Sequence, residues 1–536
     1  MKIIYLKSNL HEKIMCGIFF YKGHRPQEYL IKQHRKIQHR GPDHSDTLTL
    51  NDLFFGFHRL SINGLDEKSN QPMNQNGIYL ICNGEIFNYK KLIEEYKFDY
   101  KTGSDCEIII HLYQKVGIEG TVNALDGEYA FVLYDSHLNK IFVSRDHLGI
   151  RSLFIGINQK EICISSEMKA IDDTFEVDQF KPGSYSVIND DLSIINKEYG
   201  QYDNLEMFNK GDEEKHIHNI KRLMEEAVKK RLMSDRNIAC LLSGGLDSTI
   251  VTGLVAKYID AKNLNTYSIG LRGSVDLYYS NIAAKHFKTN HTMLEFTTEN
   301  FIQSIERVIY QTESYDVTTI RASIGNYLVS CYIRDHSEDR VIFCGDVSDE
   351  IFGSYRGFYY APNTRDFYDE NAKMLENIHY FDVLRSDKTI SGAGLEARVP
   401  FGDKDLVRYV MGIDPKYKVF TKDKMEKYLL RKAFEDLLPS ELCWRVKTAF
   451  SDGIGSVGDP WHEAVKTHME TKYTDDEFNE KRKKYMINPP YDKESLYYRE
   501  MFESYFPNKD TLIPYFWKQP FMDSEDPSAW CAEKTA

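Results

Sequence analysis

The stretch Ser243-Gly244-Gly245-Leu246-Asp247-Ser248 follows an apolar run typical of a strand, 238–242, and precedes a run typical of a helix, 249–259. Paired glycines let the backbone approach an anion closely, and the N–H groups at the start of a helix favour negative charge. Because the carboxylate of Asp247 would repel a phosphate, the loop also calls for a divalent cation, Mg2+, between the two. Taken alone the stretch could be an ordinary turn. Between a strand and a helix, it predicts a pyrophosphate site.

The segments around this loop alternate between the two kinds of secondary structure. Strands are predicted at 238–242, 266–271, 291–296 and 341–344, and helices at 213–233, 249–259, 277–287, 301–312 and 321–334. Such alternation predicts an α/β domain with a parallel sheet covered by helices on both faces, which binds ligands beyond the carboxyl ends of its strands. From 384 onward the pattern is mostly helical. The Walker A pattern is absent from the chain, which excludes a kinase or P-loop interpretation.

The first 200 residues contain short β-rich runs separated by turns, at 17–21, 53–57, 78–82, 129–134, 141–144, 161–165 and 183–188. This density of strands predicts a sheet-rich first domain. A polar segment at 200–214 separates it from the alternating region. Because 536 residues exceed what one core usually organises, at least two domains are expected.

Composition restricts the partners and the compartment. A formal net charge of -13 disfavours nucleic acid and anionic membrane surfaces, since both would repel the chain. No apolar stretch approaches the roughly 18 residues needed to span a bilayer. The nine cysteines are scattered, with no C-x-x-C pair, which is typical of a reduced, cytoplasmic protein. Small molecules are therefore the expected partners, and a homodimer stays open.

A second distinctive stretch is Met15-Cys16-Gly17-Ile18-Phe19. If translation began at Met15 and the methionine were removed, Cys16 would become the N-terminal residue. Its α-amine, with a pKa of about 8, could then act as the base for its own thiol, whose pKa is about 8.5. In isolation, a small buried cysteine at the start of a strand is the commoner case.

Further stretches follow in order: H-R-G-P-D at 39–43, H-R-L-S-I at 58–62, N-G-E-I-F-N at 83–88, T-G-S-D-C-E at 102–107 and R-D-H-L-G at 145–149. Arg59 offers a planar fork for a carboxylate, and Asp105 with Glu85 can hold an α-ammonium group. The Asn83 side chain and the Gly84 N–H suit an oxyanion hole. As a set, these stretches resemble a class II glutamine amidotransferase, an N-terminal-nucleophile hydrolase.

The loop at 243–248 in turn resembles the ATP pyrophosphatase signature S-G-G-x-D-S. A class II glutaminase followed by an ATP pyrophosphatase domain is the layout of the glutamine-hydrolysing asparagine synthetases. The chain resembles their bacterial type B form from Met15 to about Asp526, and the stretches at 315–323, 394–401 and 444–453 add to the likeness. The resemblance implies an α+β N-terminal-nucleophile sandwich followed by the α/β domain.

The same resemblance implies a reaction. Ammonia released from L-glutamine at Cys16 would pass through an internal tunnel to β-aspartyl-AMP, made from L-aspartate and ATP with Mg2+. The products would be L-asparagine, AMP and pyrophosphate. An apolar conduit would keep ammonia neutral and nucleophilic, whereas bulk water would protonate it.

Residue roles follow from the resemblance as well. Glutamine would be bound and hydrolysed by Cys16, Arg59, Leu60, Ser61, Ile62, Asn83, Gly84, Glu85 and Asp105. ATP would be bound by Leu241, Ser243, Gly244, Gly245, Asp247, Ser248, Ile269, Gly345 and Lys447, with Mg2+ on Asp247 and Asp349 and the phosphates on a catalytic Lys447. Aspartate and its adenylate would contact Thr318, Thr319, Arg321, Asp346, Asp382 and Arg385, beside Asp387 and Lys388. A surface ion-pair network explains the charged cluster at 382–388 nearly as well.

Departures from the family pattern fall at the chemistry. The family's usual S-G-E-G-S-D-E is replaced here by Cys344-Gly345-Asp346-Val347-Ser348-Asp349-Glu350. The side chain of Asp346 is one methylene shorter than that of the family's catalytic glutamate, and a small misplacement can cost about 100-fold, so we expect Asp346 to serve at a reduced rate. Val347 replaces a glycine, and a β-branched residue disfavours positive φ. Either glycine's freedom is not needed there, or the loop follows a different path. Gly402 replaces a common leucine.

The resulting domain prediction is a glutaminase domain at 16–205, a synthetase domain at 213–526 and a tail at 527–536. The extension at 1–15 is expected to be absent from the active protein, because Cys16 would otherwise lack a free amine. Alternatives are an impaired or ammonia-dependent synthetase, a β-lactam synthetase-like cyclase, and a degenerate nucleotide-binding regulator. Retention of Cys16, Arg59, Asn83 and Asp105 weighs against the cyclase.

Overall fold

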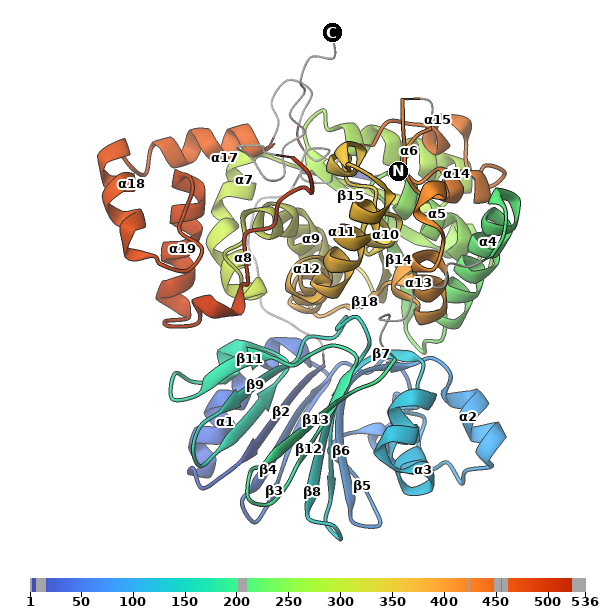
Figure 1. The fold of residues 1–536 in the computed structure, drawn as a ribbon. Helices are drawn as coiled ribbons and strands as arrows, with labels where there is room; N and C mark the ends of the chain where they lie inside the picture. The colour runs from blue at the N-terminus through green and yellow to red at the C-terminus, as the bar shows by residue number, and fades with distance from the viewer. Residues whose placement is uncertain are drawn as a thin grey trace.

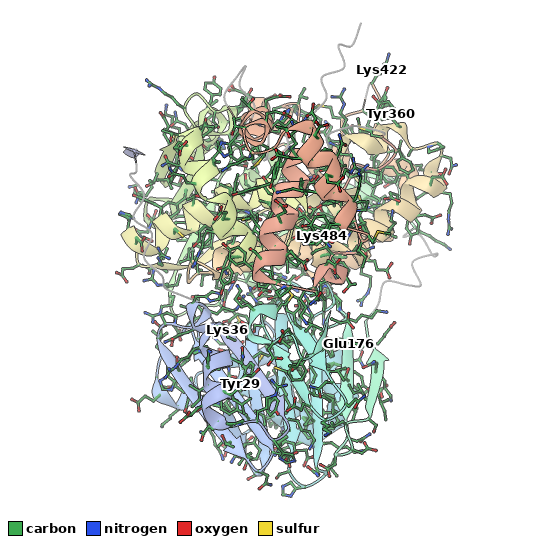
Figure 2. All side chains as sticks on the ribbon, turned by 90° about the vertical axis from the view of Figure 1, so that its left-hand side faces the viewer. Tyr29, Lys36, Glu176, Tyr360, Lys422 and Lys484 are labelled. Carbon is green, nitrogen blue, oxygen red and sulfur yellow. The ribbon has the colours of Figure 1, made fainter. Side chains whose placement is uncertain are left out.

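The computed structural model describes residues 2–5, 16–200, 210–422, 424–447, 455 and 461–522. They form two domains, the first below and the second above in Figure 1. Figure 2 shows the same division from the side, with Tyr29, Lys36 and Glu176 on the first domain and Tyr360 and Lys484 on the second. The predicted boundary at 205, the tail at 527–536 and residues 6–15 of the extension lie outside the described residues.

The first domain is built on two antiparallel six-stranded sheets that stack face to face. Their inner faces share an apolar core in which Phe20 and Phe57 of one sheet pack with Ile81 and Val132 of the other. One sheet has the order β11 (Glu176–Gln179), β9 (Phe154–Ile157), β10 (Ile162–Ser165), β2 (Gly17–Lys22), β4 (Leu53–Arg59), β3 (His44–Leu50). The other has the order β13 (Ile194–Glu198), β12 (Ser184–Ile188), β8 (Lys140–Arg145), β7 (Gly127–Asp135), β6 (Ile78–Ile86), β5 (Met73–Gln75).

Helices cover the outer faces of this sandwich (Figure 1). On one side, α1 (Gln27–Arg35) packs on β4 so closely that a Cβ at Gly56 would lie 2.7 Å from the His34 ring. On the other side, α2 (Tyr89–Tyr96) and α3 (Ile108–Ala124) share a second apolar core with β6 and β7. This helix–sheet–sheet–helix arrangement confirms the sandwich expected for the first domain.

The second domain is built on one parallel six-stranded sheet, which confirms the α/β prediction. Its order is β1 (Lys2–Tyr5), β16 (Asn290–Phe296), β15 (Asn265–Leu271), β14 (Asn237–Leu241), β17 (Asp339–Phe343), β18 (Glu396–Arg398). The central strands are those predicted from their apolar runs. The edge strands β1 and β18 were not predicted, and β1 places part of the extension beside β16.

The helices of this domain cover the sheet or pack on one another (Figure 1). They are α4 (Glu213–Lys230), α5 (Leu246–Val255), α6 (Val275–Phe287), α7 (Thr298–Gln303), α8 (Ile305–Thr312), α9 (Val317–His336), α10 (Ser348–Phe352), α11 (Thr364–Glu376), α12 (Asp382–Ser391), α13 (Lys404–Met411), α14 (Tyr428–Ala433), α15 (Ser440–Cys443), α17 (Trp461–Glu470), α18 (Asp475–Lys481) and α19 (Lys493–Tyr505). The single helix predicted at 301–312 is split at Ser304, whose hydroxyl donates to the Asn300 carbonyl. No helix in the described part of the chain is long and apolar enough to cross a bilayer.

Buried ion pairs hold the two domains together. Arg40 pairs with Glu167 of its own domain at 2.9 Å and reaches Asp387 of α12 at 3.0 Å. Lys388 pairs with Glu313 within the second domain, and Glu313 lies 3.6 Å from Lys169 of the first. Asp387 and Lys388 therefore belong to the domain boundary, although the sequence grouped them with the aspartate-binding cluster. Removing one partner of a buried pair costs about 3–5 kcal/mol, so these contacts fix the orientation of the domains.

Candidate functional site

Cys16 lies directly before β2, where the first domain meets the second. The Leu60 N–H donates to Cys16 Sγ at 3.1 Å, and Arg40 Nε donates to the Cys16 carbonyl at 2.8 Å. Burial raises the pKa of the Cys16 thiol to about 12, against the opposing effect of the Leu60 N–H. A thiol with that pKa needs a base at neutral pH, and the α-amine of a trimmed Cys16 would supply one.

The predicted oxyanion hole is built on β6. Asn83 is 1% exposed, and its Nδ2 has no hydrogen-bond partner among the described residues. Gly84 has φ of +151°, and a Cβ there would lie 2.2 Å from the Glu128 carbonyl oxygen, so a side chain has no room. The unpaired, buried amide group of Asn83, next to the Gly84 backbone, suits an acceptor atom that becomes negatively charged only during the reaction.

The carboxylates predicted to hold the α-ammonium group lie close together. Asn63 Nδ2 donates to Glu85 Oε2 and lies 3.5 Å from Asp105 Oδ1, while the Ile86 N–H donates to Asp105 Oδ2 at 2.6 Å. Glu85 and Asp105 are both buried. Their carboxylates meet at Asn63 and supply the negative charge that an α-ammonium group requires.

The stretch 58–62 has mixed surroundings. Arg59 Nη1 donates to the Asp66 carbonyl at 2.9 Å and to Asn70 Oδ1 at 2.7 Å, so a substrate carboxylate would have to share or displace these acceptors. The Ser61 N–H donates to Asp43 at 2.8 Å. The side chains of Leu60 and Ile62 are buried in the apolar cluster at the domain boundary.

In the second domain, a cavity opens beyond the carboxyl ends of β14 and β17. Most of the residues predicted for ATP, aspartate and Mg2+ line it: Leu241, Ser243, Gly245, Asp247, Ser248, Thr318, Thr319, Gly345, Asp346, Asp349, Asp382, Arg385 and Lys447. Gly244, Ile269 and Arg321 are not among its lining residues. The side chain of Ile269 is buried in the core, and Arg321 Nη2 lies 2.5 Å from Glu494 in a buried ion pair.

The positive charge in this cavity includes a residue that the sequence analysis missed. Lys427 Nζ lies 2.6 Å from Asp247 Oδ2 and 2.5 Å from Asp349 Oδ1, and Lys447 also pairs with Asp349. Burial disfavours the charge on Asp349, but Lys427 and Lys447 outweigh it and hold the pKa of this carboxyl well below its usual value. Asp349 is therefore ionised, and the side chains of Asp247 and Asp349 converge on Lys427.

Asp346 is fixed by α12. The Ser386 hydroxyl donates to Asp346 Oδ2 at 2.5 Å, and Arg385 Nη2 lies 3.4 Å from Oδ1 while it also pairs with Asp382. The shorter side chain is thus held on the α12 side of the cavity. It is within reach of a ligand there, because Asp346, Arg385 and Thr318 all line the same space.

Residues 15–216 match the model of the glutamine amidotransferase domain, and residues 219–373 and 363–530 match that of asparagine synthase. The asparagine synthetase [glutamine-hydrolyzing] of Gallus gallus is 38% identical over 554 residues, which cover 96% of this chain and 98% of that protein. The chain belongs to the glutamine-hydrolysing asparagine synthetases.

More distant matches agree in part. The probable asparagine synthetase [glutamine-hydrolyzing] of Acanthamoeba polyphaga mimivirus is 35% identical over 549 residues, 96% of this chain and 99% of its own. A solved glutamine phosphoribosylpyrophosphate amidotransferase from B. subtilis, complexed with ADP and GMP, is 16% identical with a TM-score of 0.32, and covers 52% of this chain and 81% of its own. The assignment to the asparagine synthetase family rests on the family models and the full-length relatives.

An apolar cluster lies between the two sites of this asparagine synthetase family member. It joins Leu60 and Ile150 of the first domain to Cys344 and Val347 of the second, and Cys16 packs against it. The residues that line the second-domain cavity do not include Cys16. An ammonia path would therefore run through packed apolar side chains at this cluster.

The family departure at Val347 retains the backbone that glycine favours. Val347 has φ of +76°, which costs a β-branched residue about 1–3 kcal/mol. Its side chain is buried, and a Cβ built at Gly402 would lie 3.7 Å from Val347 Cγ2. The two departures are thus neighbours, and the valine fills space beside the position where the family commonly has leucine.

We expect Val347→Gly and Gly402→Leu to destabilise the protein separately and to compensate each other. The first change relieves strain but removes a buried side chain worth about 1.5–3 kcal/mol. The second brings a Cβ within 2.9 Å of Ile150 Cδ1, and overpacking of this kind costs about 1–3 kcal/mol. In the double variant, the leucine at position 402 occupies the space that the Val347 side chain leaves. Thermal unfolding midpoints of the single and double variants measure this coupling.

A double variant whose midpoint falls by the sum of the two single losses would contradict the compensation. Gly156→Leu, on β9 of the first domain, would place a Cβ 2.6 Å from Ile171 Cγ2, away from this cluster; it serves as the matched control and should show no coupling to Val347→Gly.

Proposed function

We propose that this protein makes L-asparagine from L-aspartate in an ATP-dependent reaction, with ammonia from L-glutamine as the nitrogen source. Aspartate would be activated as β-aspartyl-AMP in the second-domain cavity, with release of pyrophosphate, and ammonia would displace AMP. Glutamine would be hydrolysed at Cys16, with Asn83 and Gly84 stabilising the oxyanion. We further propose that the active protein begins at Cys16 and acts in the cytoplasm.

One observation carries the proposal. A chain of this family holds a half-buried thiol facing a backbone donor, Cys16 against Leu60, and also a cavity in which two lysines, Lys427 and Lys447, pair with Asp349. The thiol supports acyl transfer from an amide, and the lysines support transfer of a nucleotide with loss of pyrophosphate. Together they supply the two half-reactions that glutamine-dependent amidation requires.

Mg2+ fits the second-domain cavity. No cluster of three or more metal-ligating side chains occurs among the described residues, but Mg2+ needs only one or two carboxylates when phosphates and waters complete its shell. Asp247 and Asp349 lie in the first turns of α5 and α10 and meet at Lys427, so they would hold the ion. When bound, it would neutralise charge on the departing pyrophosphate.

The residues of this chain then have distinct tasks. Lys427 and Lys447 would place positive charge against the phosphates, Thr318 and Thr319 would help to seat aspartate, and Asp346 would accept the proton lost by the attacking ammonia. Ser386 and Arg385 hold Asp346 for this task. Arg321 would act from behind the cavity wall, since its guanidinium is engaged by Glu494.

A single assay tests the proposed function. Purified protein is given aspartate, ATP and Mg2+ with either glutamine or ammonium, and asparagine, AMP and pyrophosphate are measured. We expect all three products with either nitrogen source. Omitting aspartate should abolish pyrophosphate release. A nucleotide-binding regulator would release no pyrophosphate under any of these conditions, and a cyclase would not couple the release to ammonia.

A further inference from the structure

The strand β18 of the synthetase domain places two charged side chains against the glutamine pocket. Arg398 Nη2 lies 3.6 Å from Glu85 Oε2, and Arg398 Nε donates to Glu396 Oε1 at 2.8 Å. Both β18 side chains are buried, and Nη2 has no hydrogen-bond partner among the described residues. The pocket that the first domain forms around Glu85 and Asp105 is therefore completed by the second domain.

The backbone of the same strand is bonded to both halves of the protein. The Cys344 N–H donates to the Arg398 carbonyl at 3.1 Å, and Cys344 begins the loop that carries Asp346. On the other side, Arg151 of the glutaminase domain donates to the Ala397 carbonyl at 2.9 Å. One three-residue strand thus lies between the glutamine pocket and the loop at the acyl adenylate site.

The charges that face Glu85 oppose one another. Burial raises the pKa of Glu85 well above its usual value, the negative charges of Asp105 and Glu396 raise it further, and Arg398 lowers it. Burial likewise raises the pKa of Asp105 to about 6. Other titratable or charged groups that interact with these carboxylates are Cys16, Tyr89, Tyr100, Cys106 and Arg151, and Arg59 interacts with Cys16. An arriving α-ammonium group would therefore replace a proton held among the carboxylates.

We propose that Glu396 and Arg398 are positioning residues of the glutamine pocket, and that β18 couples its occupancy to the loop at 344–347. The inference rests on the proposed glutaminase activity of the first domain. Glu396 and Arg398 set the charge of Glu85. When glutamine binds and β18 shifts, the hydrogen bond from the Cys344 N–H to the Arg398 carbonyl transmits that displacement to the adenylate loop. Such coupling is reciprocal, so an occupied adenylate site also tightens the glutamine pocket.

A purely structural role for the pair predicts something different. Arg398 Nη1 also donates to the Met233 carbonyl at 2.5 Å, which by itself would anchor β18 to the segment after α4. If anchoring were its whole task, substitutions would weaken glutamine binding equally at every pH. The direction in which the pH profile moves therefore separates the two roles.

The test uses the full-length protein and measures kcat/KM for glutamine hydrolysis over about pH 4 to 9, where carboxyl groups and the thiol titrate. Glutamine binding should fall as pH drops through the pKa of Glu85. Glu396→Gln removes a cause that raises this pKa, so the acid limb should move to lower pH. Arg398→Met removes a cause that lowers it, so the limb should move to higher pH. A shift of one pH unit changes binding on that limb by about tenfold.

The matched control is Asp339→Asn, another buried carboxylate at the opposite end of the neighbouring strand β17, where it accepts from Tyr267 at 2.7 Å. Its profile should coincide with that of the unmodified protein. If Arg398→Met fails to fold, Glu396→Gln decides alone. Unshifted profiles for Glu396→Gln, or shifts in the same direction for both variants, would overturn the positioning role.

Coupling has its own readout, the ratio of asparagine formed to glutamine hydrolysed with saturating aspartate and ATP. Glu396→Gln should lower this ratio severalfold while ammonia-dependent synthesis stays at the unmodified level. An unchanged ratio would overturn the coupling. Failure of the proposed function is distinguishable, because the unmodified protein would then hydrolyse no glutamine at any pH.

Discussion

Replacing Cys16 with alanine is expected to lower glutamine-dependent asparagine formation by about 10^4-fold, the scale seen when a nucleophile is removed. Ammonia-dependent formation should stay within about twofold, because the adenylate site uses none of the Cys16 atoms. The physical reason lies in the site. Burial raises the pKa of this thiol to about 12, so its reactivity depends on a base that serves this one sulfur. The measurement is asparagine formed from ammonium-free glutamine and, separately, from ammonium.

Cys163→Ala is the matched control. Cys163 is a buried free thiol of the first domain, on β10, and its loss should leave both activities unchanged. Glutamine-dependent synthesis that survives in Cys16→Ala would contradict the assignment of the nucleophile. The intact mass of the active unmodified protein completes the test, since a retained Met1 would leave Cys16 without the amine that we assign as its base.

Replacing Lys427 with methionine should lower aspartate-dependent release of pyrophosphate from ATP by about 10^2 to 10^4-fold. Lys427 Nζ is the shared partner of Asp247 and Asp349. Its removal leaves two carboxylates facing each other in a cavity that must accept a triphosphate. Breaking a buried pair from one side costs about 3–5 kcal/mol, which sets the size of the expected loss. Pyrophosphate release at saturating ATP and Mg2+ measures it.

Two comparisons sharpen this prediction. Lys447→Met removes a partner of Asp349 alone, so it should impair the reaction with a smaller loss of folding stability. Lys424→Met, three residues before Lys427 and paired with Glu213 on α4, should leave pyrophosphate release unchanged. Glutaminase activity reports whether each variant is folded. A Lys427→Met protein that releases pyrophosphate at the unmodified rate would remove Lys427 from the site.

Much of the fold could be predicted because its signals are local. The apolar run at 238–242 and the helical periodicity after it indicate β14 and α5 without reference to the rest of the chain. The edge strands β1 and β18 carry no such signal. Glu396-Ala397-Arg398 is short and mostly charged, and it forms a strand because β17 lies beside it. Such strands form because they pair with a segment that is distant in the sequence, and a single sequence does not reveal that pairing.

The candidate sites divide in the same way. Glu85 with Asp105, and Asp247 with Asp349, were predicted from motifs, and the structure brings each pair together. Lys427 was missed because it follows Asp247 by 180 positions and has no motif of its own. Arg321 shows the reverse case, a motif residue that does not line the cavity. The motif points to the substrate, whereas helix α19 supplies Glu494 to occupy the guanidinium.

The boundary between the domains has a consequence for how the enzyme could be divided. Arg40 on one side pairs with Asp387 on the other, and Lys169 on one side lies 3.6 Å from Glu313 on the other, all across a single boundary. Each half expressed separately would expose these charged groups to water without their partners. The glutamine pocket of the first domain would also lack the side chains that the second domain places beside it. A split enzyme should therefore regain activity when the halves are mixed and should lose it again as added salt screens their recombination.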